Sequence, residues 1–344
     1  MKYLILSFSL FYIILGCNDA PSSASNDSSQ SRPEYALAVH GGAGTIVRER
    51  MTGGLEEAYR KAINEALTIG EEILKNGGSA MDAVEQTLIF MEDSPLFNSG
   101  KGAVLTYEGI AELDASFMEG ASQNAGAVGG MRTIRNPIRA ARAVMEQSPH
   151  VFLTGKGAEQ FAIEQGLDTV PNSYFITERR LEAWKQKHLE GAPAKSGILE
   201  TAPAADYYGT VGCVALDKEG NLAAGTSTGG MSDKRYNRIG DSPIIGAGTY
   251  ANNSTCAVSC TGHGEFFIRY AVAYDMSARM AYLKEDVGTA ADYIIQEYLV
   301  EKGGGGGLIA LDRKGEIALP FNTPGMSRGY VRPGERYVAL YKDE

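Results

Sequence analysis

A predicted β-hairpin between Asp206 and Gly230 constrains the fold of this chain more than any other feature. Its sequence is DYYGTVGCVALDKEGNLAAGTSTGG. Thr210 to Leu216 alternates as a strand does, residues 217–220 form a turn, and Asn221 to Thr228 returns as a second strand. A Gly-Thr step stands directly before the first strand. Most such hairpins are surface structures built from β-branched residues, so the surrounding sequence must decide whether this one carries chemistry.

The elements around the hairpin predict an α+β fold, because hairpins dominate and strict βαβ alternation is missing. Ser79, with Asp82 three residues later, is expected to cap the second helix. Before the hairpin we expect strands at 35–39, 104–107, 110–118, 126–133 and 151–153, and helices at 54–75, 79–91, 137–147, from 156, and near 178–189. After it we expect strands at 244–246, 255–261, 308–312, 315–320 and 336–341, and helices at 265–283 and 286–301.

Composition excludes several classes of function. The net charge of -10 argues against a nucleic-acid partner and against polybasic membrane binding. The glycine clusters HGGAG and GGGGG fit neither phosphate-loop pattern, so nucleotide binding is not expected. Cys213, Cys256 and Cys260 are expected to be buried thiols, since Cys256 and Cys260 in one strand would lie roughly 13 Å apart.

The first residues are expected to lie outside the fold. Residues 1–16 resemble a signal peptide, because the apolar run that starts at Tyr3 is too short to span a bilayer and ends in Leu15-Gly16-Cys17. A Cys at the first mature position resembles the lipobox of bacterial lipoproteins, with an ordinary signal peptide as the alternative. Residues 17–33 would be a flexible tether. The expected location is therefore exported: periplasmic, or membrane-anchored through a lipid on Cys17.

The Gly209-Thr210 step suits an N-terminal nucleophile. A Thr hydroxyl needs an adjacent base, and the α-amine of an N-terminal Thr supplies one. That amine has an ordinary pKa of about 7.7–8.0, near working pH. An internal Thr must first be exposed by cleavage, and Gly209 tolerates the strained backbone that attack on its carbonyl requires. The Ala- and Pro-rich segment Glu190 to Asp206 would act as an exposed linker that lets the new ends separate.

Several motifs in one order resemble a known family. GTVGCVALD, AGTSTGGM, RIGDSPIIGAG and SCTGHGE follow AVHGGAG, SPLFNSGKGAV and AELDASFMEG. Together they resemble the plant-type L-asparaginase and isoaspartyl peptidase family of N-terminal-nucleophile hydrolases, from about Tyr35 to Arg328. The resemblance implies a four-layer αββα sandwich. It also implies an autoproteolytically activated amidohydrolase that cleaves β-aspartyl dipeptides and L-asparagine and releases L-aspartate.

The same resemblance assigns roles to residues. Thr210 would be the nucleophile, and Thr228 would hydrogen-bond near its freed amine. Arg238 would pair with the substrate α-carboxylate and Asp241 with the α-ammonium. The Thr261 hydroxyl and the Gly262 N–H would form the oxyanion hole. Beside these, Asn98 would pack toward the nucleophile, and His263 is better interpreted as a surface or supporting residue.

The family also implies an assembly and an ion. Cleavage between Gly209 and Thr210 would give an α subunit (34–209, with the linker at 190–208) and a β subunit (210–344) that together form one domain, and two such units would form an (αβ)2 homodimer. No cofactor is expected for catalysis. A structural Na+ would be held by main-chain oxygens of one loop: Met91, Glu92, Ser94, Phe97, Ser99 and Lys101.

Two alternative functions remain at this point. A glycosylasparaginase-type amidase shares the nucleophile, but that branch would lack PLFNSGKGAV. An inactive periplasmic binding lipoprotein could keep the fold without the chemistry, against which the intact Gly209-Thr210 step, Arg238 and Asp241 weigh. Denaturing electrophoresis separates an enzyme of this type from a binder, because processing gives two chains.

Overall fold

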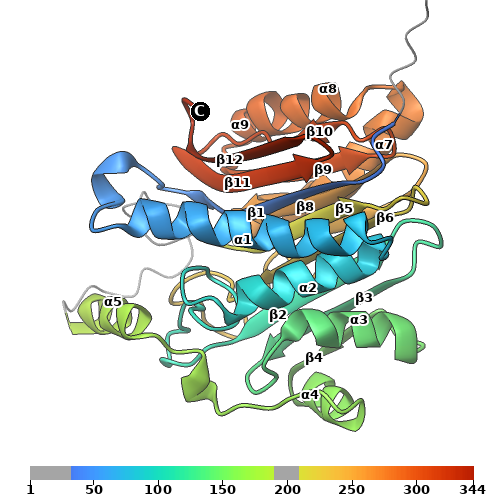
Figure 1. Cartoon of the computed structure of the whole chain (residues 1–344). Coiled ribbons are helices and arrows are strands. Elements are labelled where there is room, and N and C mark those ends of the chain that lie inside the picture. Colours follow the sequence, from blue (N-terminus) through green and yellow to red (C-terminus); the bar gives the residue numbers. More distant parts are fainter. Residues whose placement is uncertain (1–31, 190–208) are drawn as a thin grey trace, which may run out of the picture. The chain divides into compact units, whose positions relative to one another are not determined.

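Two β-sheets packed face to face form the centre of the protein, with helices on both outer faces (Figure 1). The computed structural model describes residues 32–189 and 209–344. The expected signal peptide, Cys17, nearly all of the tether and the linker at 190–208 lie outside these residues. The described part of the chain is a four-layer αββα sandwich, as the resemblance implied.

The larger sheet holds eight strands, and its strand order is β12-β11-β1-β5-β6-β2-β3-β4. All neighbouring strands of this sheet are antiparallel except β3 and β4, which α3 connects in parallel. The strands in this order are Glu335–Tyr341, Gly325–Arg332, Ala36–Gly44, Val211–Leu216, Leu222–Thr228, Leu113–Glu119, Ala125–Met131 and Phe152–Thr154.

The smaller sheet holds four antiparallel strands in the order β10-β9-β8-β7. They are Ile317–Ala318, Gly306–Asp312, Cys256–Gly262 and Thr249–Ala251. β8 and β9 pack against β5 of the larger sheet. This stacking places the end of β8 beside the start of β5, where Thr210 lies.

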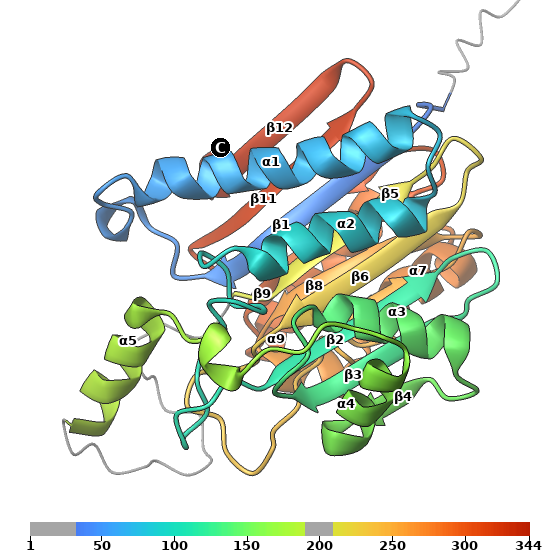
Figure 2. The same ribbon diagram turned by 60° about the horizontal axis from the view of Figure 1, so that its bottom comes forward.

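Helices α1 (Leu55–Lys75), α2 (Ala80–Asp93) and α3 (Pro137–Gln147) cover the free face of the larger sheet (Figure 2). The hydroxyl of Ser79 accepts from the N–H of Asp82 at 3.1 Å, which confirms the predicted cap of α2. On the far side, α6 (Gly264–Arg269), α7 (Val272–Ala278), α8 (Val287–Asp292) and α9 (Leu299–Glu301) cover the smaller sheet. The remaining elements are α4 (Gly155–Glu164), α5 (Glu178–Leu189), the 3-10 turns Arg48–Arg50 and Asn172–Tyr174, and the π-helical turns Arg279–Leu283 and Tyr293–Tyr298.

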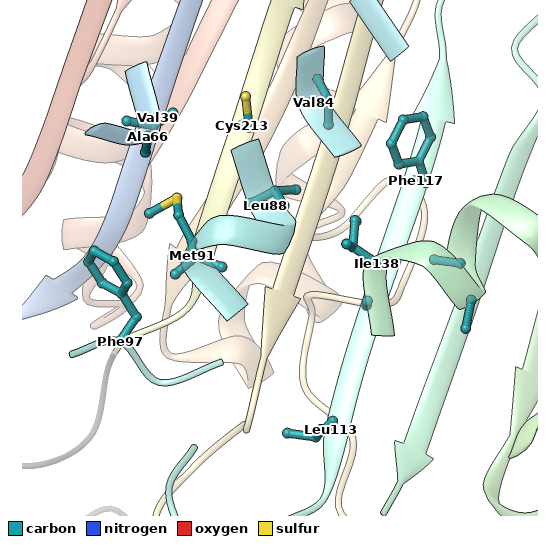
Figure 3. Packing of buried hydrophobic residues seen from close by; sticks show 14 of the residues in the cluster. Val39, Ala66, Val84, Leu88, Met91, Phe97, Leu113, Phe117, Ile138 and Cys213 are labelled. Carbon is teal, nitrogen blue, oxygen red and sulfur yellow. The ribbon is translucent and has the colours of Figure 1, made fainter. Parts of the chain in front are cut away.

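Each of the three spaces between layers is filled by its own apolar core. Figure 3 shows part of the first core, where Leu88 and Met91 of α2 lie over Val39 and Cys213 of the larger sheet. Small residues such as Ala38 fill the second core, between the sheets. The third lies between the smaller sheet and the outer helices. Burial of all three apolar interfaces is the main force that fixes the sheets relative to each other.

The structure differs from the predicted elements in several places, among them the strands β7 and β11, which were not predicted. Residues 104–107 form no strand, and only an isolated bridge joins Leu105 to Ala111. Residues 244–246 are likewise a turn with one bridge. The predicted helix at 265–283 is interrupted at Ala271, whose φ of 48° is left-handed and breaks the helical hydrogen bonding.

Candidate active site

The hairpin formed by β5 and β6 brings Thr210 next to Thr228. Val211 pairs with Ser227 in the antiparallel register, so the residue before β5 lies beside the last residue of β6. The Thr210 hydroxyl donates to the Thr228 hydroxyl across 3.0 Å. The N–H of Gly230 also donates to that Thr228 oxygen, at 2.9 Å. Both threonines are buried, and the predicted neighbourhood of these two side chains is present.

The peptide bond that precedes Thr210 is held by the loop at Asn98. The Asn98 N–H donates to the Gly209 carbonyl oxygen at 3.1 Å. Gly42, with φ of 106°, approaches so closely that a Cβ there would lie 2.5 Å from the Gly209 Cα. Only glycine fits both the positive φ and this approach. The HGGAG segment therefore serves to pack one backbone against another.

His40 lies beside Thr210 and was not predicted as a site residue. Its Nδ1 lies 3.0 Å from the Thr210 carbonyl oxygen, and its Nε2 lies 3.0 Å from the Ser259 hydroxyl. Complete burial lowers the pKa of His40 to about 3, so the ring is neutral at working pH. Because a carbonyl can only accept, Nδ1 carries the proton and Nε2 accepts from Ser259. The Ser259 hydroxyl is bonded in turn to that of Thr226, at 2.6 Å.

Thr261 and Gly262 end strand β8 at the edge of the same site. The Thr261 oxygen accepts from the N–H of Ala43 at 3.3 Å, which leaves its hydroxyl proton available to donate. Gly262 has φ of 155°, and a Cβ there would lie 2.6 Å from the Cα of Gly306 on β9. The run GGGGG thus provides the close strand contact beside this residue.

A small pocket opens between these strands and the segment that follows β6. Five predicted residues meet there: Thr210, Thr228, Arg238, Asp241 and Gly262. The rest of its lining is Gly230, Met231, Gly240 and Ser242. Thr261 directly precedes the lining residue Gly262, and the Asn98 side-chain amide donates to the oxygen of the lining residue Gly230 at 2.8 Å.

Arg238 is held by a carboxylate from its own chain. Its Nε and Nη2 donate to the two oxygens of Glu265 at 3.0 and 2.9 Å, a bidentate pair. Burial raises the pKa of Glu265, but the Arg238 guanidinium more than offsets this and the pKa lies below its ordinary value. The Nη1 atom faces Gly240, where a Cβ would lie 2.8 Å away. Glu265 thus bonds Nε and Nη2, and both Arg238 and Gly240 line the pocket.

Asp241 is a buried carboxyl group at the same wall of the pocket. Its Oδ2 has no hydrogen-bond partner among the described residues. Burial raises the pKa of Asp241 to about 7, although the nearby Arg238 acts in the opposite direction. A buried acceptor without a partner costs free energy unless a donor arrives. The site is thus suited to a ligand that brings a cationic donor.

The loop predicted to hold Na+ connects α2 to the region of Asn98. Its polar side chains point into the protein: the hydroxyls of Ser99 and Ser227 bond at 2.8 Å, and Ser227 donates to Glu92 at 2.6 Å. Complete burial raises the pKa of Glu92 to about 8. Since Ser227 directly precedes Thr228, these side chains attach the loop to the end of β6.

The main-chain oxygens of that loop fit a hard cation in part. A Cβ at Gly102 would lie 2.7 Å from the oxygen of Pro95 and 2.8 Å from that of Phe97, so these two carbonyls converge. Pro95 was not predicted. The oxygen of Glu92 accepts from the N–H of Lys101 at 2.7 Å, and that of Met91 accepts from Ser94 at 3.3 Å. Within 32–189 and 209–344, no group of three or more His, Cys, Asp or Glu residues could hold a metal ion.

Comparison with known proteins gives a consistent result. Residues 33–339 match the family model described as Asparaginase. The isoaspartyl peptidase of Escherichia coli is 47% identical over 309 residues, which cover 90% of this chain and 96% of that protein. A probable isoaspartyl peptidase/L-asparaginase of Arabidopsis thaliana is 42% identical, with 90% and 99% covered. The isoaspartyl peptidase/L-asparaginase of Rattus norvegicus is 41% identical, with 93% and 95% covered.

These comparisons contradict the expected location. The prediction of an exported periplasmic or lipid-anchored protein rested only on residues 1–33, and the matched relatives come from a bacterium, a plant and a mammal. Their names describe isoaspartyl peptidases and no lipoprotein, and the match covers 95–99% of each relative. The lipobox interpretation of Cys17 is therefore withdrawn. Among the residues that the structure describes, no helix has the length and apolar character to cross a membrane.

Proposed function

The chain belongs to the asparaginase family, and from this premise we propose that it hydrolyses β-aspartyl dipeptides and L-asparagine and releases L-aspartate. The observation that carries the proposal is the pocket in which the Thr210 hydroxyl, Arg238 and Asp241 meet. The Thr210 hydroxyl would attack the acyl group of an aspartyl substrate. The fixed guanidinium of Arg238 would bind its α-carboxylate, and the Asp241 carboxyl group would bind its α-ammonium.

Activation would begin with the chain's own peptide bond. The Thr210 hydroxyl attacks the Gly209 carbonyl carbon, the C–N bond breaks as the nitrogen takes a proton, and water then hydrolyses the ester. Support comes from the Asn98 N–H, which already bonds the Gly209 oxygen and would stabilise the developing charge. The products are the α subunit (34–209) and the β subunit (210–344), with a free α-amine on Thr210.

Substrate hydrolysis would reuse the same groups. The Thr210 hydroxyl attacks the β-carbonyl of the substrate while its own amine takes the proton. Thr228, 3.0 Å from the hydroxyl, would orient it. The Thr261 hydroxyl and Gly262 N–H would bind the oxyanion. The leaving amine takes the proton, and water attacks the aspartyl ester to regenerate Thr210. No cofactor is needed for this sequence of steps.

Arg238 and Asp241 would recognise the aspartyl part of the substrate. Because Glu265 occupies the Nε and Nη2 edge of Arg238, the substrate α-carboxylate would take the edge that faces Gly240. The α-ammonium would supply the donor that the Asp241 carboxyl group lacks. L-Asparagine and β-Asp-X share both groups, so these residues select the acyl side and not the leaving group.

We expect β-aspartyl dipeptides to be better substrates than L-asparagine. The glycines around the pocket place few bulky side chains in the way of a larger leaving group, whose binding could then contribute to transition-state stabilisation. An α-Asp-X peptide carries its free carboxylate elsewhere and should be inert. The test is kcat/KM for β-Asp-Leu, L-asparagine and α-Asp-Leu side by side. Comparable cleavage of α-Asp-Leu would contradict the proposed roles of Arg238 and Asp241. Faster cleavage of L-asparagine than of β-Asp-Leu would contradict only the expected order of the two substrates.

Two further family features are part of the proposal. Two processed units would form an (αβ)2 homodimer, which sedimentation of the processed protein tests. Na+ would be held by main-chain oxygens of the loop after α2, with the Phe97 carbonyl among them, and would only stabilise this loop. A dependence of the unfolding temperature on Na+ that K+ does not reproduce would support the ion. A glycosylasparaginase and an inactive binding protein are not favoured, given the names of the matched relatives.

A further inference from the structure

Helix α5 is attached to the rest of the protein through Trp184, the single tryptophan of the chain. Figure 2 shows α5 apart from the helices that cover the larger sheet. The indole Nε1 donates to the carbonyl oxygens of Thr106 and Tyr107 at 3.0 and 3.3 Å. Gly109 has φ of 77°, and a Cβ there would lie 3.1 Å from the indole ring. The indole is thus seated on the turn at 106–109.

His188, one turn later on α5, extends this contact toward the active-site side of the same turn. Its ring stacks on Trp184 with centroids 4.4 Å apart and lies 5.0 Å from the ring of Tyr107. Its Nδ1 bonds the Trp184 carbonyl oxygen at 2.9 Å, which fixes the ring. Its Nε2 lies 3.3 Å from the Asp233 Oδ1 without the geometry of a hydrogen bond, and the Lys187 Nζ lies 3.5 Å from Oδ2 of the same carboxylate. The last turn of α5 therefore places two basic side chains against Asp233.

Asp233 belongs to the segment 230–238, which ends at the substrate-binding Arg238. The segment is bonded to the turn through the Asp233 N–H, which donates to Leu105 at 2.8 Å, and through the Lys234 oxygen, which accepts from Tyr107 at 3.0 Å. Left-handed φ values occur at three of its non-glycine residues: Asp233, Tyr236 and Asn237. Such a backbone persists only where its surroundings hold it. Tyr236 is 90% exposed, whereas Lys234 is buried and its Nζ donates to the Glu112 oxygen at 3.2 Å, so the segment is held by Lys234 as well as on the side of α5 and the turn.

We propose that α5 positions the substrate-binding segment: Trp184 and His188 hold Asp233, and through it they set the placement of Arg238. The inference rests on the proposed function, since it concerns the affinity for the aspartyl substrate. His188 precedes the proposed cleavage point and Asp233 follows it. Once the chain is cut, the contact joins the α subunit to the β subunit next to the pocket. The residues of α5 touch no reacting atom, so they act on binding and not on the chemical step.

The test compares His188→Ala and Asp233→Asn with the unchanged enzyme. Lys185→Ala, at an exposed position on the same helix, is the matched control. We expect KM to rise about three- to tenfold in both variants, the range for the loss of one partly exposed polar contact, with kcat within about twofold. The rise should be equal for β-Asp-Leu and L-asparagine, because Arg238 binds the part that they share. Denaturing electrophoresis should still show two subunits.

The outcomes separate this inference from the proposed function. If the unchanged enzyme releases no L-aspartate from β-Asp-Leu, the proposed function fails. If it is active and both variants keep its KM, the inference about α5 is wrong. A fall in kcat with unchanged KM also contradicts it, because a positioning role acts on substrate binding. Asp233→Asn retains the shape of the side chain and keeps the test valid if His188→Ala folds poorly.

Discussion

The main-chain N–H of Asn98 donates a hydrogen bond to the carbonyl oxygen of Gly209 across 3.1 Å. The same residue uses its side-chain amide to bond the Gly230 oxygen at 2.8 Å and the Val104 N–H at 2.8 Å. One residue thus connects the bond proposed to break on activation with the turn that follows Thr228. If the Gly209–Thr210 bond is cut as proposed, the bond to Gly230 would still hold the Asn98 loop of the α subunit against the turn after Thr228 in the β subunit.

Replacing Thr228 with Val should slow both processing and turnover. Val keeps the volume of the side chain but removes the oxygen that accepts from the Thr210 hydroxyl at 3.0 Å. We expect kcat to fall roughly 10- to 100-fold, about 1.4–2.7 kcal/mol, with little change in KM. Thr228→Ser retains the hydroxyl and should keep most of the activity. Equal kcat values for the Val and Ser variants would show that the hydroxyl has no role.

Replacing Arg238 with Ala should abolish substrate binding and leave processing intact. The loss of a charge-assisted contact to the α-carboxylate corresponds to roughly 2–4 kcal/mol in kcat/KM. Self-cleavage involves no substrate carboxylate, so two subunits should still form. Arg238→Lys keeps the positive charge but lacks the planar guanidinium, so its kcat/KM should lie between those of the original enzyme and Arg238→Ala. A processed Arg238→Ala enzyme with kcat/KM within twofold of the original would refute the assigned role.

The affinity for substrate should weaken as the pH falls below about 7. Burial raises the pKa of Asp241 to about 7, so its carboxyl group becomes neutral in this range. A neutral carboxyl group no longer attracts the substrate α-ammonium, and KM should therefore rise toward acid pH. The measurement is KM against pH for β-Asp-Leu between pH 5 and 9. In Asp241→Asn, KM should be high at every pH. If KM in that variant still rises below pH 7 as it does in the original enzyme, Asp241 is not the group that titrates.

Glu92→Gln should stabilise the protein at high pH but not at low pH. The pKa of Glu92 is raised by burial from 4.5 to about 8, so the folded state holds a proton that the unfolded chain releases above pH 4.5. The stability of the native protein therefore falls as the pH rises from about 4.5 to 8. Gln has no proton to lose, and the variant should gain roughly 3–4 kcal/mol at pH 8 relative to pH 5.

Urea unfolding at pH 5 and pH 8 measures this difference. Glu65→Gln, at an exposed position of α1, is the control and should show no such gain. Equal effects of Glu92→Gln at the two pH values would mean that Glu92 ionises normally in the folded protein.

Local patterns in the sequence identify the hairpin and its threonines, because a two-strand register follows from the alternation and the turn. The register predicted in this way places Thr210 beside Thr228, and the pairing of β5 with β6 has the same register. The family motifs supply Arg238 and Asp241, which lie in the same pocket. The four-layer order came from the family resemblance, because the residue patterns alone predict only helices packed on mostly antiparallel sheets.

The parts of the site that sequence alone could not give depend on contacts between distant strands. His40 reaches Thr210 only because β1 pairs with β5, where His40 faces Gly212. A single buried His after a strand gives no local signal of that pairing. The Glu265 side chain was overlooked within TGHGE, although a Glu near a recognised Arg is a signal that could have indicated the ion pair. The left-handed Ala271 that breaks the predicted helix has no sequence signal either.

The intact mass of the purified protein, compared with that of Thr210→Ala, tests the central claim most directly. The account predicts two chains for the original protein, the second of which begins at Thr210 and ends at Glu344. For Thr210→Ala it predicts a single uncut chain that releases no L-aspartate from β-Asp-Leu, because the hydroxyl serves both reactions. Two chains from Thr210→Ala, cut at the same bond, would contradict the assignment of Thr210 as the nucleophile.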